Sequence, residues 1–172
     1  VTVSGAINST GGAAGILDLD QSVTFTDNVG QVQSLASMDV RGGFTVTMQG
    51  LSNQIDAVTL DDNGGVGAIL LFDQDGTTFT GAIDSAGGEE TGVLDINGNT
   101  TLGSGFDSGQ VNSLGEVQIA ATKSLTLNSS LATHDLTLEG DGQLILDAAG
   151  IVVTVTNGVQ DSNDNGSILV EN

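Results

Sequence analysis

The sequence repeats itself, and this tandem repeat constrains the fold more than any other feature. The segment Val3–Gly12 (VSGAINSTGG) returns as Phe79–Gly88 (FTGAIDSAGG), and Gly30–Leu35 (GQVQSL) returns as Gly109–Leu114 (GQVNSL). The two pairs are offset by 76 (79 − 3) and 79 (109 − 30) residues, so the period is about 78 residues. Internal repetition of this kind is typical of solenoids and arrays of small domains.

The repeat divides the chain into two full copies and the beginning of a third. The copies cover residues 1–78 and 79–154, and the partial copy covers 155–172, where Thr156–Asp161 resembles the opening segment. We therefore expect residues 1–172 to form one continuous unit. Catalytic residues are rarely needed in duplicate, whereas a structural or adhesive surface gains from being copied, so the repeat favours a non-catalytic protein.

Apolar and polar residues alternate in short pieces throughout both copies, which is the period of a strand with one buried face. The pieces recur about every ten to twelve residues, and no segment has the period of a helix, so the chain is predicted to be all-β. Six glycine-containing dipeptides separate the pieces and suit turns with positive φ: Gly42-Gly43, Gly64-Gly65, Asp75-Gly76, Asn97-Gly98, Asp141-Gly142 and Asn157-Gly158. The residues expected to point inward are Leu17, Leu19, Val23, Phe25, Leu94, Ile96, Leu125, Leu127, Leu136 and Leu138, with Asp18 and Asp95 outside.

Two architectures can use these strands. A β-solenoid, or parallel β-helix, would coil each repeat into three or four stacked turns. Tandem immunoglobulin-like β-sandwiches would make each repeat a separate domain with a bulky core, usually built on an aromatic anchor. The chain has no Trp or Tyr and only 5 Phe. Layers of Val, Leu and Ile suit the narrow interior of a solenoid, which is the fold we expect, with the sandwich as the alternative.

The charge of the chain excludes several classes of partner. Asp and Glu total 22 against 2 Lys and Arg, giving a formal net charge of −20. Such a field repels nucleic acid and anionic membranes, and no apolar run approaches the ~20 residues that a transmembrane helix needs. There is no Cys, so disulfides and thiolate metal sites are excluded. The carboxylates also repel one another, which favours bound cations.

The segment Thr77–Leu131 resembles the β-strand repeats of giant bacterial surface proteins. These include filamentous-haemagglutinin-like and autotransporter passenger adhesins and rickettsial-type surface antigens. The phrases Phe79–Asp84 (FTGAID) and Val111–Leu114 (VNSL) carry the likeness. The resemblance implies an exported β-helical stalk, adhesin or surface-layer (S-layer) component, and it implies no catalytic residue.

One loop has the pattern of a calcium site. Residues Asp161–Ile168 (DSNDNGSI) fit the first eight positions of a D-x-N-x-N-G-x-I loop, in which Asp161, Asn163 and Asn165 would supply oxygen ligands. The twelfth position, which is usually a bidentate Glu, is Asn172. The sequence therefore predicts calcium as a weakly bound cofactor at this loop, and a solvated Asn/Asp turn is the alternative.

Other carboxylates lie at predicted turns, in Asp61-Asp62-Asn63, Asp73 with Asp75, and Glu89-Glu90. Clustered oxygens of this kind prefer hard cations such as Ca²⁺. We expect most of them to form the solvated face of the strands.

Enzymatic functions find little support in the sequence. His134 is the single histidine, which excludes a hydrolase built on several His ligands, and Thr133-His134-Asp135 reads as a turn. Arg41 and Lys123, the only bases for a lyase-like proton abstraction, lie at roughly corresponding places in the two copies, as features of the repeat would. No catalytic residue is predicted.

The sequence thus predicts a structural segment of an exported bacterial surface protein, located extracellularly or at the cell surface. It would serve as an adhesin stalk, surface-layer or fibre component. Its expected partners are adjacent repeats or other copies of itself, joined end to end, together with host or matrix glycans. The terminal strands near Val1–Val3 and Ile168–Val170 are expected to be unpaired edges. The alternative is a calcium-dependent carbohydrate-binding or carbohydrate-cleaving β-helix module.

Overall fold

The protein is an all-β solenoid built from parallel strands, as the sequence predicts. The computed structural model describes residues 1–12, 14–86, 91–105 and 107–171, and within these ranges it contains strands and turns but no helix. The strands are β1 (Thr2–Val3), β2 (Gly15–Leu19), β3 (Val23–Phe25), β4 (Leu35–Val40), β5 (Thr45–Met48), β6 (Ser52–Leu60), β7 (Ile69–Phe72), β8 (Thr77–Ser85), β9 (Val93–Ile96), β10 (Thr100–Leu102), β11 (Leu114–Ile119), β12 (Ser124–Leu127), β13 (Leu131–Leu138), β14 (Gln143–Leu146), β15 (Val153–Asp161) and β16 (Ser167–Val170).

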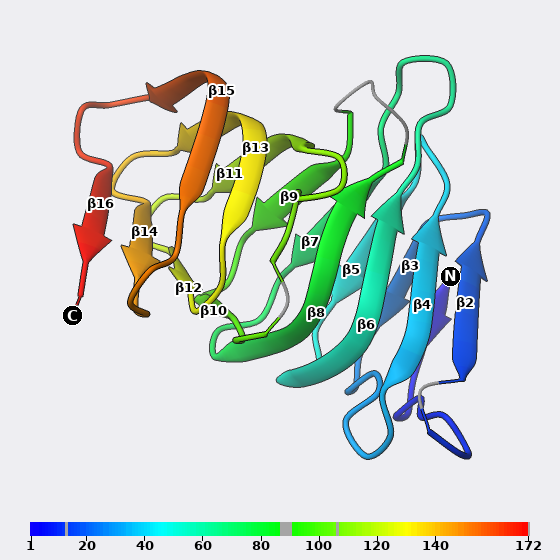
Figure 1. Cartoon of the computed structure of the whole chain (residues 1–172). Helices are drawn as coiled ribbons and strands as arrows, with labels where there is room; N and C mark the ends of the chain where they lie inside the picture. Colours follow the sequence, from blue (N-terminus) through cyan, green and yellow to red (C-terminus); the bar gives the residue numbers. More distant parts are fainter. Residues whose placement is uncertain (13, 87–90, 106, 172) are drawn as a thin grey trace.

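The strands form two parallel sheets that wind into a stack of about seven coils. Odd-numbered strands pair in the order β1-β3-β5-β7-β9-β11-β13-β15, and even-numbered strands pair in the order β16-β14-β12-β10-β8-β6-β4-β2. Residues that face each other on neighbouring coils are about 23 positions apart, as in Thr2, Thr24 and Thr47. The two termini lie at opposite ends of the stack (Figure 1).

The longest strands turn a corner, and this gives each coil three sides. The first part of β8 pairs with β10, whereas β4 pairs mostly with the second part of β6. The register between β6 and β8 shifts between Gln54 and Ala57, and the register between β13 and β15 shifts between Thr133 and Asp135. Figure 1 shows the bend in β6 and β8. These four strands therefore each belong to two sides of the coil.

We name the sides by their strands. Face 1 holds β1, β3, β5, β7, β9, β11 and the second parts of β13 and β15. Face 2 holds Ile7, Val29, the first parts of β6 and β8, and then β10, β12, β14 and β16. Face 3 holds β2, β4, the second parts of β6 and β8, Ser108, and the first parts of β13 and β15. Along the chain the order is always face 1, face 2, face 3.

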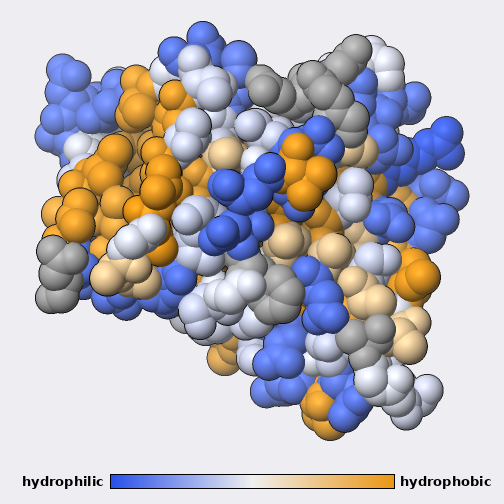
Figure 2. All heavy atoms as spheres, viewed as in Figure 1, coloured by the Kyte–Doolittle hydropathy of each residue, from blue (hydrophilic) through white to orange (hydrophobic). Residues whose placement is uncertain are grey.

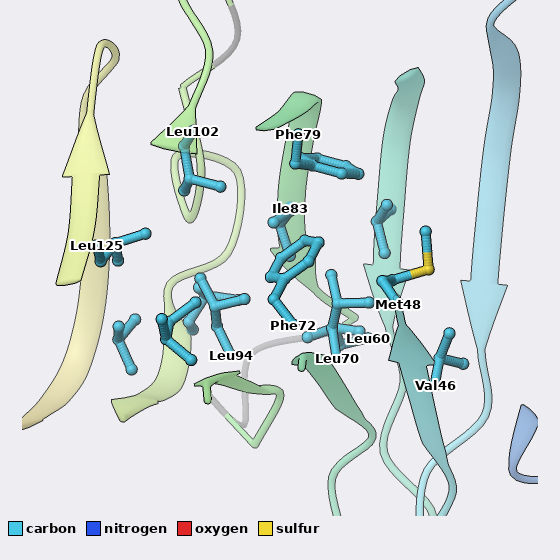
Figure 3. Packing of buried hydrophobic residues seen from close by; sticks show 14 of the residues in the cluster. Val46, Met48, Leu60, Leu70, Phe72, Phe79, Ile83, Leu94, Leu102 and Leu125 are labelled. Carbon is cyan, nitrogen blue, oxygen red and sulfur yellow. The ribbon is translucent and has the colours of Figure 1, made fainter. Parts of the chain in front are cut away.

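The interior consists of ladders of apolar side chains stacked from coil to coil. One ladder on face 1 runs Val3, Phe25, Met48, Phe72, Ile96, Ile119, Leu138 and Asp161. One on face 2 runs Asn53, Phe79, Leu102, Leu127, Leu146 and Val170, and one on face 3 runs Leu17, Met38, Val58 and Ile83. Figure 3 shows these side chains meeting from different strands, with Phe72 and Phe79 near one another. All ten predicted inward residues lie in such rows, although Leu17 and Leu19 of the first coil are only partly buried.

Burial of these ladders is the main stabilising contribution, since each fully buried aliphatic side chain contributes ~1.5–3 kcal/mol. A narrow interior needs no large aromatic anchor, and the chain has no Trp. The composition therefore suits a solenoid, and the parallel pairing of all named strands rules out the sandwich alternative, whose sheets are antiparallel.

Polar side chains at the corners connect one coil to the next. The Asn99 amide N–H donates to Asp75 Oδ1 (2.8 Å), and Asn99 Oδ1 in turn accepts from the Ser124 N–H (3.0 Å). At another corner, Asp107 Oδ1 accepts from the Ser130 N–H (2.7 Å). Backbone amides that leave the sheet at a corner would otherwise lack a partner. Several of the carboxylates and amides therefore have a local structural role.

The sequence repeat and the coil are out of phase by one face. Leu17 on face 3 corresponds to Leu94 on face 1, Phe25 on face 1 to Leu102 on face 2, and Val58 on face 3 to Leu136 on face 1. Between the two residues of each pair, the chain passes through three complete coils and then advances by one more face. Equivalent surfaces of successive copies thus point in directions that differ by a third of a turn.

Two local expectations were wrong. Positive φ is confirmed at Gly43, Gly64, Gly65 and Gly76, but Gly98, Gly142 and Gly158 do not adopt it. Gly158 lies within β15, and a Cβ on Gly98 would come 2.4 Å from the Gln74 carbonyl carbon. Close approach of a neighbouring coil, and not a turn, explains glycine at 98. His134 lies in β13, where the strand passes a corner, and its Nδ1 is 3.0 Å from Thr156 Oγ1, so this segment is not a turn between strands.

Candidate functional site

The outer surface of face 1 carries a network of carboxylates and amides. Asp95 lies half-buried in the row between Leu71 and Gln118. Beside it, Gln118 Nε2 donates to Glu139 Oε1 (2.6 Å) and Thr137 Oγ1 donates to Glu116 Oε1 (2.6 Å). Burial raises the pKa of Asp95, and Glu139, Glu116 and Asp73 raise it further by charge repulsion. This network is a place where negative charge is concentrated.

Replacing Asp95 with asparagine is expected to stabilise the protein at neutral pH. A raised pKa means that the folded state favours the protonated carboxyl, so the stability it contributes is present at low pH and lost as pH rises through the folded-state pKa. Asn keeps the shape without the charge. We expect thermal melts of Asp95→Asn at pH 7 to show a gain of ~0.5 kcal/mol, reduced by solvent screening, and no gain below pH ~3. The control is Asp147→Asn, an exposed carboxylate; an equal gain at both positions would contradict the local explanation.

A second acidic surface lies on face 3, where a shallow cavity is lined by Asp18, Asp20, Asp39, Val40, Arg41 and Asp61. Asp18 and Asp39 are direct neighbours on β2 and β4. Arg41 Nη1 lies 3.5 Å from Asp20 Oδ1, and both side chains are largely exposed. Asp18 in the first copy corresponds to Asp95 in the second. The acidic surface therefore lies on face 3 in the first copy and on face 1 in the second.

The two basic side chains lie at different corners. Arg41 follows β4, at the corner between faces 3 and 1, whereas Lys123 precedes β12, at the corner between faces 1 and 2. Lys123 Nζ contacts both carboxylate oxygens of Asp75 (3.0 and 3.1 Å). The Asn99 N–H and then Lys123 lower the pKa of Asp75. Each base is thus paired with a carboxylate in the structure.

The predicted calcium loop connects β15 to β16, and its first residue already has partners within the loop. Asp161 Oδ1 accepts from the Asn163 N–H (3.2 Å), and Asp161 Oδ2 accepts from the Gly166 N–H (2.9 Å). Asp164 adopts a positive φ of 58°, which an Asp tolerates in a tight turn. Asp161, Asn163 and Asn165 lie in one short loop, as predicted. The carboxylate of Asp161 shapes that loop by accepting its amides.

Asp161 has a structural counterpart, Ser85, in the second copy that sequence comparison did not reveal. Ser85 Oγ accepts from the Gly92 N–H (3.2 Å) as Asp161 accepts from Gly166. A Cβ on Gly92 would meet Leu60 and Ser85, and one on Gly166 would meet Leu138 and Asp161. Both glycines therefore pack against an inward Leu of the preceding coil and against the residue whose side chain accepts their N–H. The feature of the sequence that could have indicated this match is the glycine just before the next strand, Gly92 before β9 and Gly166 before β16.

The described residues contain no further cluster of side chains that could hold a metal ion. Outside residues 13, 87–90, 106 and 172, no group of three or more His, Cys, Asp or Glu side chains is placed to hold one ion. Glu89-Glu90 and Asn172, named above as sequence candidates, lie outside the described residues. In the same part of the chain, no helix has the length and hydropathy needed to cross a membrane.

Comparison with known proteins identifies one similar chain over nearly the whole length. The sequence is 31% identical over 196 aligned residues to "Outer membrane protein A" of Rickettsia rickettsii. The alignment covers 99% of this chain and 8% of that protein. No family profile matches the sequence, and no solved structure matches it. The similarity agrees with the resemblance to rickettsial-type surface antigens, and the solenoid agrees with the β-helical repeats of such proteins.

Proposed function

We propose that this chain is a non-catalytic structural segment of an exported bacterial surface protein, in which solenoid units join end to end into a stalk or fibre. The observation that carries the proposal is the state of the two terminal coils. β1 and β2 end the two sheets on one side and β15 and β16 end them on the other, so each terminal coil presents unpaired backbone groups. Unpaired parallel edges are templates for a further strand.

The apolar side chains at the ends support the same function. At the C-terminal end, Ile168, Leu169 and Val170 are exposed, and Figure 2 shows apolar atoms gathered at the end of the stack where Figure 1 places β14 to β16. At the N-terminal end, Val1 and Ile16 are exposed. The apolar rows of face 2 reach the C-terminal end through Ile168 and Val170, and that of face 3 reaches the N-terminal end at Leu17, whereas the face 1 row ends in Asp161. A further coil, from an adjacent repeat or another copy, would extend them.

The similarity to "Outer membrane protein A" of Rickettsia rickettsii supports the proposed location at the bacterial surface. It spans this chain from end to end while using 8% of the relative's length, as expected if such segments are units of a long array.

The test is concentration-dependent elongation of the isolated chain. We expect small-angle X-ray scattering at 0.15 M NaCl to show particles that lengthen with concentration. The double variant Ile168→Lys/Val170→Lys, which places charges on the C-terminal edge, should stay one chain long. Leu51→Lys/Val66→Lys is the control, because both residues are exposed away from the ends. A wild-type chain that remains monomeric at every concentration would contradict end-to-end assembly. Binding to glycans on an array would instead favour the carbohydrate-binding alternative.

Calcium binding is proposed as a stabilising feature of the same segment. The net charge of −20 opposes the compact state, and monovalent salt can only screen it. An ion that binds only the folded chain adds ~2.7 kcal/mol at a hundred times its dissociation constant. We expect millimolar CaCl₂ to raise the melting temperature by ~5–10 °C more than NaCl of equal ionic strength. Asp161→Asn should remove most of the difference, and equal midpoints in the two salts would contradict the proposal.

A further inference from the structure

Two corner loops, one in each copy of the repeat, have the same conformation. The first is Gly30–Ser34 and the second is Gly109–Ser113. The Gly30 N–H donates to the Ile7 carbonyl (2.7 Å) as the Gly109 N–H donates to the Ile83 carbonyl (2.8 Å). Both glycines have positive φ, 76° and 70°. A Cβ on either would lie 1.9 Å from a backbone oxygen of the next coil, so glycine is required at both positions.

The tips of the two loops are held by matching hydrogen bonds. The Val32 N–H donates to Asn8 Oδ1 (2.8 Å), and the Val111 N–H donates to Asp84 Oδ1 (3.2 Å). Further matching bonds run from the Ser9 N–H to the Gln33 carbonyl and from the Ser85 N–H to the Asn112 carbonyl, both 3.3 Å. The loops are therefore fixed shapes, which reduces the ordering entropy of any contact they make.

Each loop presents a valine to solvent from a stretch of sequence that has no charged residue, although the Val111 N–H itself donates to the Asp84 carboxylate of another strand. Val111 is 81% exposed and Val32 is 74% exposed, the highest values among the exposed large apolar residues of the described chain. The stretches Asn28–Met38 and Ser108–Gly115 contain no charged residue, although the chain as a whole carries −20. Exposed apolar side chains at the same place in two identically shaped loops form a repeated surface that another protein can contact.

The phase of the repeat determines where these loops lie. Gly30–Ser34 connects Val29 on face 2 to β4 on face 3, whereas Gly109–Ser113 connects Ser108 on face 3 to β11 on face 1. The loops thus occupy successive corners, a third of a turn apart and ~16 Å apart along the axis at ~4.8 Å per coil. A third copy would place its loop at the remaining corner. The repeat therefore places the same loop at successive corners of the stack.

We propose that these Gly-Gln-Val loops are side-by-side contacts between copies of this chain. Two chains that approach sideways on the acidic surfaces of faces 1 and 3 bring carboxylates together, whereas the loops themselves carry no charged residue. Val32 is held by the neutral Asn8, and Asp84, beside Val111, already accepts the Val111 N–H. Because the two loops share one conformation, a loop of one copy can meet the equivalent loop of another in a self-complementary contact. Contacts at successive corners give each solenoid more than one lateral neighbour.

A single loop contact is small and weak, so we expect it to be transient between isolated chains and to strengthen with repetition. An interface of one loop falls well below the ~1,000 Å² of a stable complex. Long arrays carry many such loops at fixed spacing, and each contact raises the effective concentration for the next. The lateral contact is independent of the proposed end-to-end assembly, because it changes the width of the particles and not their length.

The test uses cysteine cross-linking, which has no background because the chain contains no Cys. Val32→Cys and Val111→Cys chains are oxidised separately and as a mixture at 0.5 M NaCl, where repulsion between chains is screened. A disulfide requires Cα atoms within ~7 Å, so it reports direct loop contact. We expect covalent dimers at least tenfold faster than with Val66→Cys, an exposed loop position of the same residue type. Equal rates at the three positions would overturn the proposal.

A second measurement tests the contact without added thiols. We expect the double variant Val32→Asp/Val111→Asp to lower the concentration-dependent increase in the cross-sectional radius of gyration at least threefold in X-ray scattering. Leu51→Asp/Val66→Asp adds the same charge at other exposed positions and should leave that increase unchanged. A wild-type cross-section that does not grow with concentration in 0.5 M NaCl, or one lowered equally by both double variants, would overturn the proposal. Loss of elongation with growth in width retained would count against only the end-to-end function.

Discussion

Replacing Phe79 with alanine is expected to lower the free energy of unfolding by ~3–5 kcal/mol, which is the range for removing a buried aromatic ring. Phe79 is fully buried on face 2, and its ring centroid lies 5.6 Å from that of Phe72 on face 1. The cavity would lie in the middle of the stack, where the coils on both sides are packed and cannot collapse into it. Thermal denaturation should show a drop of roughly 10 °C.

The control for this prediction comes from the ladder itself. On face 2 the row that begins with Asn53 and Phe79 continues with Leu102 and Leu127, so leucine already fits this position in later coils. We expect Phe79→Leu to cost only ~1–1.5 kcal/mol, because most of the volume is retained. Equal losses for the alanine and leucine variants would show that the ring itself, and not the filled volume, stabilises the interior.

Replacing Gly109 with alanine is expected to cost ~3 kcal/mol or more. Its φ of 70° is unfavourable for any residue with a Cβ, and that Cβ would lie 1.9 Å from the Ala132 carbonyl oxygen of the next coil. The coils would have to separate locally, which breaks hydrogen bonds around Ser108. Denaturant titration of Gly109→Ala should therefore show a much lower midpoint than that of the wild type.

Gly76 separates the two causes of this loss. Its φ is 82°, yet nothing lies within 4 Å of the Cβ position. Gly76→Ala should therefore show only the cost of the left-handed conformation, ~1 kcal/mol. If Gly76→Ala and Gly109→Ala destabilise equally, the approach of neighbouring coils is looser than the structure indicates.

The architecture was predictable because the alternation of apolar and polar residues follows directly from strand geometry. Side chains on a strand point alternately to opposite faces, so residues such as Leu94 and Ile96 could be assigned to the interior without knowing the partner strands. The absence of Trp and Tyr and the tandem repeat then favoured a solenoid over a sandwich. The exposed edges near Val1–Val3 and Ile168–Val170 followed from the same picture, and both are terminal strands in the structure.

The candidate calcium loop illustrates a limit of motif reading. The spacing of Asp161, Asn163 and Asn165 suits a cation, but the same side chains also suit a tight turn. In the structure Asp161 accepts two amides of its own loop and so serves as a loop cap, while calcium binding remains a prediction for the melting experiment. Similarly, the bend at His134 could not be foreseen, because a strand that turns a corner keeps its alternation on both sides.

The sequence by itself determined the strands, their inward residues and the repeat, because these depend on local periodicity and on matched residues within one chain. The length of a coil was not visible in it, since corner loops differ in length and about 23 residues per coil does not divide a period of about 78. Only the tertiary structure, through the hydrogen-bonded register between coils, decided that Phe25 and Leu102 occupy different faces. That register is what turns a linear repeat into one loop conformation placed at successive corners around the axis, at Val32 and Val111.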